Sequence, residues 1–111
     1  MSIRAAFFAI AASLALSAAS SASAADVAAG KAKATEVCQA CHGANGNSES
    51  ADFPKIAGQH ADYLAKTLRD YKSGLRKNAI MAGFAQALTK QDIENLAAFY
   101  GAQPAVVWAK H

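Results

Sequence analysis

The sequence predicts an all-α fold, and three observations support this prediction. Three stretches, residues 26–38, 59–73 and 89–100, carry apolar residues at the three- and four-residue spacing of a helix with one buried face. No segment has a pattern typical of a strand, an internal repeat or a second domain. Glycine, asparagine, serine and proline are concentrated between the helical stretches, where turns are expected.

The first part of the chain has the three-part pattern of a secretory signal peptide. Arg4 precedes an apolar run over residues 5–16, and small residues follow up to Ala24. The alternative is an uncleaved membrane anchor, but the run is shorter than the about 20 residues that a spanning helix needs. We therefore predict a cleaved signal peptide over residues 1–24, a mature domain over residues 25–111, export to the bacterial periplasm and no permanent membrane anchor.

Charge and size restrict what the mature chain can be. The whole chain has a formal net charge of +3, and Arg4 is the only charged side chain of the leader, so the mature part carries +2. This weak charge does not favour a nucleic acid as partner. A domain this small is marginally stable without a staple. Cys38 and Cys41 are too close in sequence to cross-link distant segments, which leaves a cofactor as the expected staple.

The first predicted helix, residues 26–38, begins at Asp26, a favourable N-cap. Gly30 lies inside it and is unfavourable there unless another element packs closely against it. Residues 43–58 follow and are rich in turn formers, so we expect a loop. A loop this long in a small domain is usually functional, and wrapping around a cofactor would account for it.

The second predicted helix, residues 59–73, is amphipathic and ends before Gly74. Its apolar face comprises Tyr63, Leu64, Thr67, Leu68 and Tyr71. Residues 75–88 have weak periodicity, so we expect a loop with one helical turn. The last helix, residues 89–100, begins with Thr89 and Asp92, which form a pair like a capping box.

Cys38, Cys41 and His42 form the pattern Cys-x-x-Cys-His, which is typical of c-type haem attachment. Two thiols at this spacing can add to the two vinyl groups of one haem, and the adjacent imidazole can bind the iron. A thioredoxin-like dithiol would need a strand–helix context, which is absent. A closed zinc site would need four ligands, and only His60 and His111 remain. We predict one covalently bound haem c with His42 as an axial iron ligand.

Met81 is the candidate for the second axial ligand. It is the only methionine left once the leader is removed, and it lies in the segment between two predicted helices. A thioether on haem iron raises the reduction potential, which suits an electron carrier. A lone methionine is often core filler. His60, His111 and an open site remain the alternatives.

Several strings of residues, taken in order, resemble a known family. They are the motif ending at His42, the stretch Pro54-Lys55-Ile56-Ala57-Gly58-Gln59, the pair Tyr63-Leu64 with Leu68, the stretch Gly74-Leu75-Arg76, and Met81. In this order they resemble class I cytochromes c over essentially all of residues 25–111. The closer similarity is to the bacterial cytochrome c-four and c-553-like group, here in a single-haem form. Cytochrome c-four itself has two such domains in tandem, and the tail around Trp108 matches no motif of the family.

The resemblance implies a small cytochrome c fold of three to five helices wrapped around the covalently bound haem. It also implies that Gly30 crosses the last helix closely near Leu96 and Tyr100. The Pro54 carbonyl is expected to accept a hydrogen bond from His42 Nδ1, which would fix the imidazole ring. The alternative is that Pro54 is only a turn residue.

The leading prediction is a monomeric electron carrier, not an enzyme, that docks transiently with a redox donor and a redox acceptor, because with both axial positions filled no iron site is free for a substrate. One alternative is a haem-carrying electron-transfer subunit of an oxidoreductase complex. A second is a haem enzyme or small-gas binder, which requires the Met81 position to be open. Lys66 and Arg69 lie on the polar face of the second helix. Such residues are usually an ordinary solvated face; the alternative is that they form part of a locally positive surface that steers partners.

Overall fold

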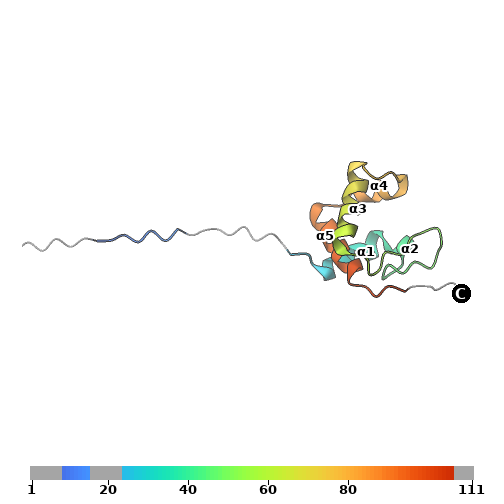
Figure 1. Cartoon of the computed structure of the whole chain (residues 1–111), viewed down its shortest axis with the longest axis horizontal. Coiled ribbons are helices and arrows are strands. Elements are labelled where there is room, and N and C mark those ends of the chain that lie inside the picture. The colour runs from blue at the N-terminus through green and yellow to red at the C-terminus, as the bar shows by residue number, and fades with distance from the viewer. Residues whose placement is uncertain (1–8, 16–23, 107–111) are drawn as a thin grey trace, which may run out of the picture.

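The computed structural model describes residues 9–15 and 24–106, which contain five helices and no strand (Figure 1). The helices are α1 (Val27–Val37), α2 (Gln39–His42), α3 (Ala61–Ser73), α4 (Ala79–Gln86) and α5 (Lys90–Gly101). The all-α prediction is therefore confirmed. Most of the predicted signal peptide lies outside the described residues, as do Trp108 and His111. Within the described ranges, no helix is both long enough and apolar enough to cross a bilayer.

The ends of the three predicted helices follow from local side-chain chemistry. The Asp26 carboxylate accepts a hydrogen bond from the Ala29 amide at 3.0 Å and caps α1. Thr89 and Asp92 form a complete capping box at the start of α5. Gly74 ends α3 in the left-handed conformation, with φ of 85°.

The prediction of a loop over residues 75–88 is wrong, because the structure contains the eight-residue helix α4 there. Asn78 starts this helix, and its side chain accepts a hydrogen bond from the Met81 amide at 2.9 Å. Nearly every residue of α4 is apolar, so no polar face alternates with an apolar one to produce a helical period. The four-residue helix α2 was also not predicted, since it is too short to show a period.

Helix α5 is the centre of the packing and contacts both α1 and α3, while α4 packs on α3. Gly30 lies where α1 crosses α5, and a Cβ there would come within 2.1 Å of the Asn95 carbonyl oxygen. The predicted close crossing is present, but it occurs at Asn95 and Phe99 instead of Leu96 and Tyr100. The Asn95 side chain also accepts a hydrogen bond from the Asp26 amide at 2.8 Å, which ties the start of α1 to α5.

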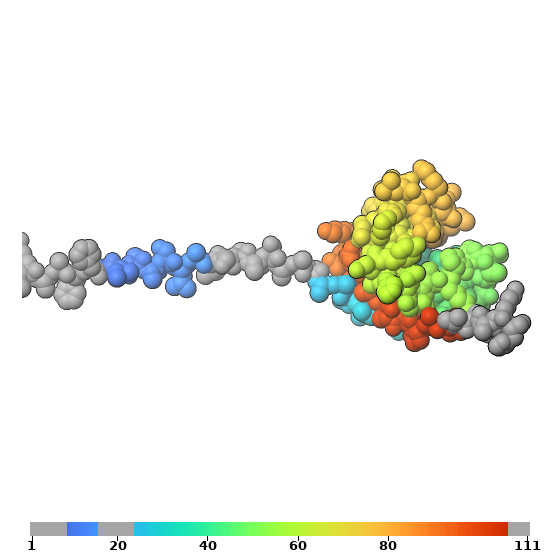
Figure 2. All heavy atoms as spheres, viewed as in Figure 1, coloured from blue at the N-terminus to red at the C-terminus, as the bar shows by residue number. Residues whose placement is uncertain are grey.

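The segment from residue 43 to 58 is a loop, as predicted, and it is closed at its base. The Gly46 carbonyl accepts hydrogen bonds from the amides of Ile56 and Ala57 at 2.8 and 3.1 Å. The Asn47 side chain reaches the end of the described chain: it donates to the Pro104 carbonyl and accepts from the Val106 amide, both at 2.8 Å. Figure 2 shows this loop and α4 as separate lobes of the molecule.

Candidate haem-binding site

The junction between α1 and α2 places both cysteines and His42 on one face of the chain. Cys38 is both the C-cap of α1 and the N-cap of α2. Its carbonyl accepts hydrogen bonds from the amides of Cys41 at 3.3 Å and His42 at 3.0 Å, so the motif forms one helical turn. Residues three and four positions apart share a helix face. Gly43 then ends the turn with φ of 82°, a conformation that glycine adopts readily.

The His42 ring is buried and held by one hydrogen bond. Its Nδ1 donates to the Pro54 carbonyl oxygen at 2.8 Å, which is the bond that the resemblance implied. Because a carbonyl can only accept, Nδ1 carries the proton, and Nε2 of the neutral ring keeps its lone pair. A carbonyl partner of this kind fixes the tautomer and orientation of a metal-binding imidazole.

His42 and Met81 both line the same crevice. Two hollows of about 220 and 150 Å³ make up this crevice, and five residues line both of them. They are Cys38, His42, Pro54, Tyr71 and Met81. The structure therefore brings together residues from the attachment motif, the long loop, α3 and α4. His60 is the N-cap of α3 and lines neither hollow, which favours Met81 over His60 as the second ligand.

Apolar and aromatic side chains make up most of the crevice wall. Leu64, Leu68, Leu96 and Ala97 line one hollow, and Val37, Phe53, Ile80 and Phe84 line the other. An apolar wall with a few polar groups is typical of a cofactor site. Two thiols, an imidazole and a thioether at such a wall fit a flat apolar ring that carries a metal ion. Among the described residues, no group of three or more His, Cys, Asp or Glu side chains is placed to hold a metal ion by itself.

Tyr100 and Cys38 lie together at the back of the crevice. The Tyr100 hydroxyl is buried and has no hydrogen-bond partner of good geometry in the part of the chain that the structure describes. Burial raises the pKa of this phenol well above its ordinary value, and the neighbouring Cys38 thiol adds to the effect. Burial also raises the pKa of the Cys38 thiol. A buried polar atom without a partner is consistent with a site whose wall is completed by a bound group.

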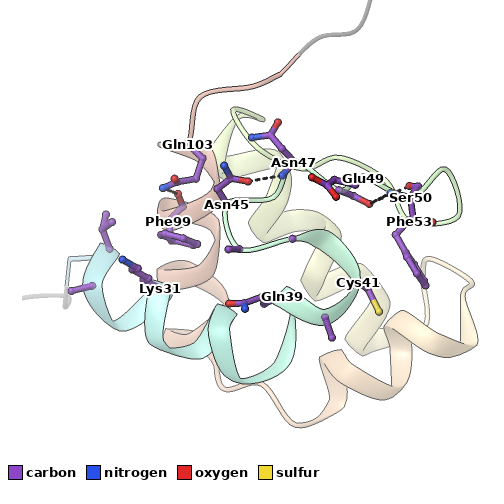
Figure 3. Close-up of a pocket in the computed structure, with 16 residues that line it drawn as sticks. Lys31, Gln39, Cys41, Asn45, Asn47, Glu49, Ser50, Phe53, Phe99 and Gln103 are labelled. Atoms are coloured by element: carbon purple, nitrogen blue, oxygen red, sulfur yellow. Dashed lines mark hydrogen bonds between the residues drawn. The ribbon is translucent and has the colours of Figure 1, made fainter.

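A larger hollow, of about 1100 Å³, is a different feature. It is an open depression beside α1 and the first part of the long loop, lined by Lys31, Asn45, Glu49 and Gln103 among others (Figure 3). Cys41 lies at its edge with the sulfur pointing away from Lys31 and Gln103. Neither His42 nor Met81 lines it, so the size of this depression does not make it the haem site.

The positions of the charged side chains differ from the sequence analysis in two ways. Lys66 forms an ion pair with Asp70, and Arg69 pairs with Glu94 at 2.9 Å. The charges of Lys66 and Arg69, on which the expected positive surface rests, are therefore largely neutralised, because each of these two cations has a carboxylate beside it. Arg76, by contrast, lines the crevice, and the sequence analysis gave it no role there.

The helical architecture and the motif on this crevice define a class of proteins. The sequence profile of the Cytochrome c family matches residues 27–100, so the chain belongs to that family. Members of this family carry haem c, covalently attached and containing iron, and Cys38 and Cys41 fit its attachment motif.

Among individual relatives, cytochrome c4 of Pseudomonas aeruginosa is 46% identical over 66 residues, which are 60% of this chain and 33% of the relative. Cytochrome c-554(548) of Halomonas halodenitrificans is 40% identical over 69 residues, or 60% of this chain and 83% of the relative. The cytochrome subunit of sulfide dehydrogenase of Chlorobaculum tepidum is 36% identical over 64 residues, or 58% and 57%.

A solved structure of similar fold is the reduced cytochrome c4 from Pseudomonas stutzeri. The TM-score is 0.70 with 42% sequence identity, and the match covers 76% of this chain and 48% of that one. The fold prediction, a small cytochrome c fold, is confirmed. The chain spans about a third of the length of the cytochrome c4 relative from Pseudomonas aeruginosa.

Proposed function

We propose that this protein is an exported monohaem cytochrome c that transfers single electrons between redox proteins. In this proposal, Cys38 and Cys41 bind one haem c through thioethers, and His42 and Met81 are the axial ligands of its iron. The observation that carries the proposal is that the attachment motif and Met81, which are far apart in sequence, line one apolar crevice.

The proposal assigns each of these side chains a distinct part in electron transfer. Bound haem supplies an iron that cycles between the ferric and ferrous states. Pro54 holds the His42 ring through Nδ1 and leaves Nε2 for the metal. The Met81 thioether favours the reduced state and raises the potential. The apolar wall keeps water away, which also favours the less charged, reduced centre.

The Asn78 side chain holds the Met81 backbone amide at the start of α4, and this helix is tied to α3. Gln86 donates to the Lys72 carbonyl at 2.7 Å, and Lys72 donates to the Leu88 carbonyl. These bonds support a Met81 position that persists in both oxidation states, as a carrier with two filled axial sites requires.

The proposal includes cleavage of residues 1–24 and a periplasmic domain over residues 25–111. The charge and hydropathy pattern of the leader supports export. Intact mass of the protein from a periplasmic fraction should equal that of residues 25–111 plus one haem. A haem-free mass, or a mass that retains the leader, would contradict this part of the proposal.

Acid–acetone extraction of the holoprotein tests the attachment, and haem should stay with the polypeptide. Met81→Ala then tests the second ligand, because removal of the thioether should lower the potential and abolish the near-infrared band of Met-ligated ferric haem. His60→Ala is the matched control and should leave both unchanged. A Met81→Ala protein with an unaltered band would show that another residue binds the iron.

Ile80 and Phe84 support transient docking beside the crevice, since they flank Met81 on α4 and are 62% and 47% exposed. The competing function is that of an electron-transfer subunit, as the name of the Chlorobaculum tepidum relative describes for that protein. Size-exclusion chromatography of the natively purified protein distinguishes the two. A free carrier should elute as a monomer of its own mass, whereas co-elution in a stable one-to-one complex would favour the subunit.

A further inference from the structure

The Tyr100 hydroxyl is a buried polar group to which the proposed function assigns no role. Tyr100 is only 3% exposed, and its hydroxyl oxygen has no hydrogen-bond partner of good geometry among the described residues. The side chain comes from α5 and lines the hollow of about 220 Å³ that Cys38, His42 and Met81 also line. Buried hydroxyl groups in proteins almost always have a partner, so this one requires an explanation.

Packing holds the Tyr100 ring in place. A Cβ at Gly46 would come within 2.8 Å of the ring, so the backbone of the long loop lies directly against it. The Phe99 ring is also close, with the two centroids 5.0 Å apart. The Tyr100 carbonyl accepts hydrogen bonds from the amides of Gly58 at 2.9 Å and Gln103 at 3.2 Å, which hold the main chain. The hydroxyl therefore cannot reach solvent unless the loop is displaced.

The Cys38 sulfur is the polar atom that interacts with this hydroxyl. Burial is the largest cause of the raised pKa of both groups, and the contact with the hydroxyl acts in the opposite direction on the thiol. Haem attachment changes the sulfur, because the thiol adds across a vinyl group: sulfur bonds to one vinyl carbon and the thiol hydrogen goes to the other. The resulting thioether has no hydrogen to donate and can only accept.

We propose that the Tyr100 hydroxyl donates a hydrogen bond to the Cys38 sulfur in the haem-bound protein and thereby stabilises the reduced haem. The inference rests on the proposed function, because it requires a thioether at Cys38. His42 offers the hydroxyl no acceptor, since its Nδ1 donates to Pro54 and its Nε2 is left for the iron.

The proposed bond has an electrostatic consequence. It satisfies the buried hydroxyl and directs the positive end of the O–H dipole toward the haem. Reduced haem carries one more negative charge than oxidised haem, and a fixed dipole acts more strongly in a surrounding of low dielectric than in water. Tyr100 is therefore a positioning residue that influences the iron from a distance, without binding it.

The direct test needs no variant, because resonance Raman spectra of the ferrous holoprotein contain the carbon–sulfur stretching bands of both thioethers. After refolding in deuterated water, one of the two bands should shift in wild type, since O–D replaces O–H in the bond to sulfur. In Tyr100→Phe neither band should respond to deuteration. Tyr63→Phe is the matched control: it removes the same hydroxyl from an exposed tyrosine that lines the same hollow, and it should retain the wild-type shift.

The midpoint potential is the second readout. Tyr100→Phe retains the ring and its packing, and the ratio of ferrous to ferric protein at a fixed potential should fall on the order of twofold. At about 59 mV per tenfold, this corresponds to a decrease of about 18 mV.

Three results would overturn the inference while the haem remains attached as proposed. They are two wild-type bands that both ignore deuteration, a deuteration shift that persists in Tyr100→Phe, and equal potentials of Tyr100→Phe and wild type. Absence of both carbon–sulfur bands from the wild-type spectrum would instead overturn the proposed function, and the inference with it.

Discussion

Two sides of the molecule are packed in different ways. On one side, α5 contributes six buried residues from its twelve and crosses α1 at backbone contact distance. On the other side, α3 has one buried residue in thirteen and α4 one in eight. Yet the apolar face of α3 is the clearest in the sequence. This difference indicates that the side formed by α3 and α4 covers a bound group, because the apolar face of α3 borders a hollow instead of other parts of the protein.

Replacement of both attachment cysteines should have the largest effect on this comparison. Cys38→Ser with Cys41→Ser should prevent covalent haem binding, and the domain should lose its stable fold because the remaining core is small. Hydrogen exchange measured by mass spectrometry should find the residual amide protection concentrated in α1 and α5. Equal protection in α3 and α4 would show that the crevice side does not depend on haem.

Gly30→Ala should destabilise the packed side of the molecule, where α1 crosses α5. The new Cβ would meet the Asn95 carbonyl at 2.1 Å, backbone that cannot move without separating the helices. Overpacking of this kind costs about 3 kcal/mol, which denaturant unfolding of the holoprotein would measure.

The matched control is Gly83→Ala in α4, where a Cβ would meet nothing within 4 Å. Alanine is the better helix former, so this variant should gain about 0.5–1 kcal/mol. Equal stability of the two alanine variants would mean that the α1–α5 crossing is not closely packed in solution.

Thr89→Ala should weaken the packed side at its helix start. Loss of the cap of α5 should reduce the free energy of global unfolding by about 1 kcal/mol. Asp92 adds a pH dependence, because the backbone hydrogen bond from Thr89 lowers the pKa of its carboxyl. A lowered pKa stabilises the fold above the ordinary pKa, and this contribution disappears as pH falls through the folded value.

Asp92→Asn should therefore be less stable than wild type at neutral pH, and the difference should shrink below about pH 4, the ordinary pKa of this group. Urea unfolding at several pH values measures this difference. A difference that stays constant across the acid range would contradict the assigned role of the carboxylate.

Asn78→Ala should produce the smallest effect and should act on the crevice side alone. Loss of an N-cap costs about 1 kcal/mol, which corresponds to about fivefold in a local opening equilibrium. Binding of imidazole in place of Met81 should therefore strengthen about fivefold, while global stability changes less than in Thr89→Ala. Unaltered imidazole affinity would show that Asn78 does not hold the methionine in place.

Sequence patterns predicted the packed side better than the crevice side. Helices with one polar face have a visible period, which is why α1, α3 and α5 could be predicted, and the attachment motif is recognisable from five residues. Helix α4 could not be predicted in this way, because its apolar residues surround the axis. The contact between Arg76 and Tyr63 could not be predicted either, since it joins residues 13 positions apart around the end of α3.

Gly30 shows a finer limit of sequence analysis. A glycine inside a helix indicates a close crossing, but the partner depends on which ridge of the other helix meets it. Here Asn95 and Phe99, four positions apart on one ridge, lie against Gly30, while Leu96 and Tyr100 lie on the next. Which pair of residues lies against Gly30 depends on the crossing angle of the two helices, and the pattern of residues in the sequence does not give that angle.

The Asn47 side chain has a practical consequence for where the folding unit ends. A chain shortened after Gly101 would keep all five helices but would lose the two bonds from Asn47 to Pro104 and Val106. The long loop would then lack its attachment to the C-terminal segment, although no helix had been touched. Fusion partners and affinity tags for this domain should therefore be joined beyond Val106.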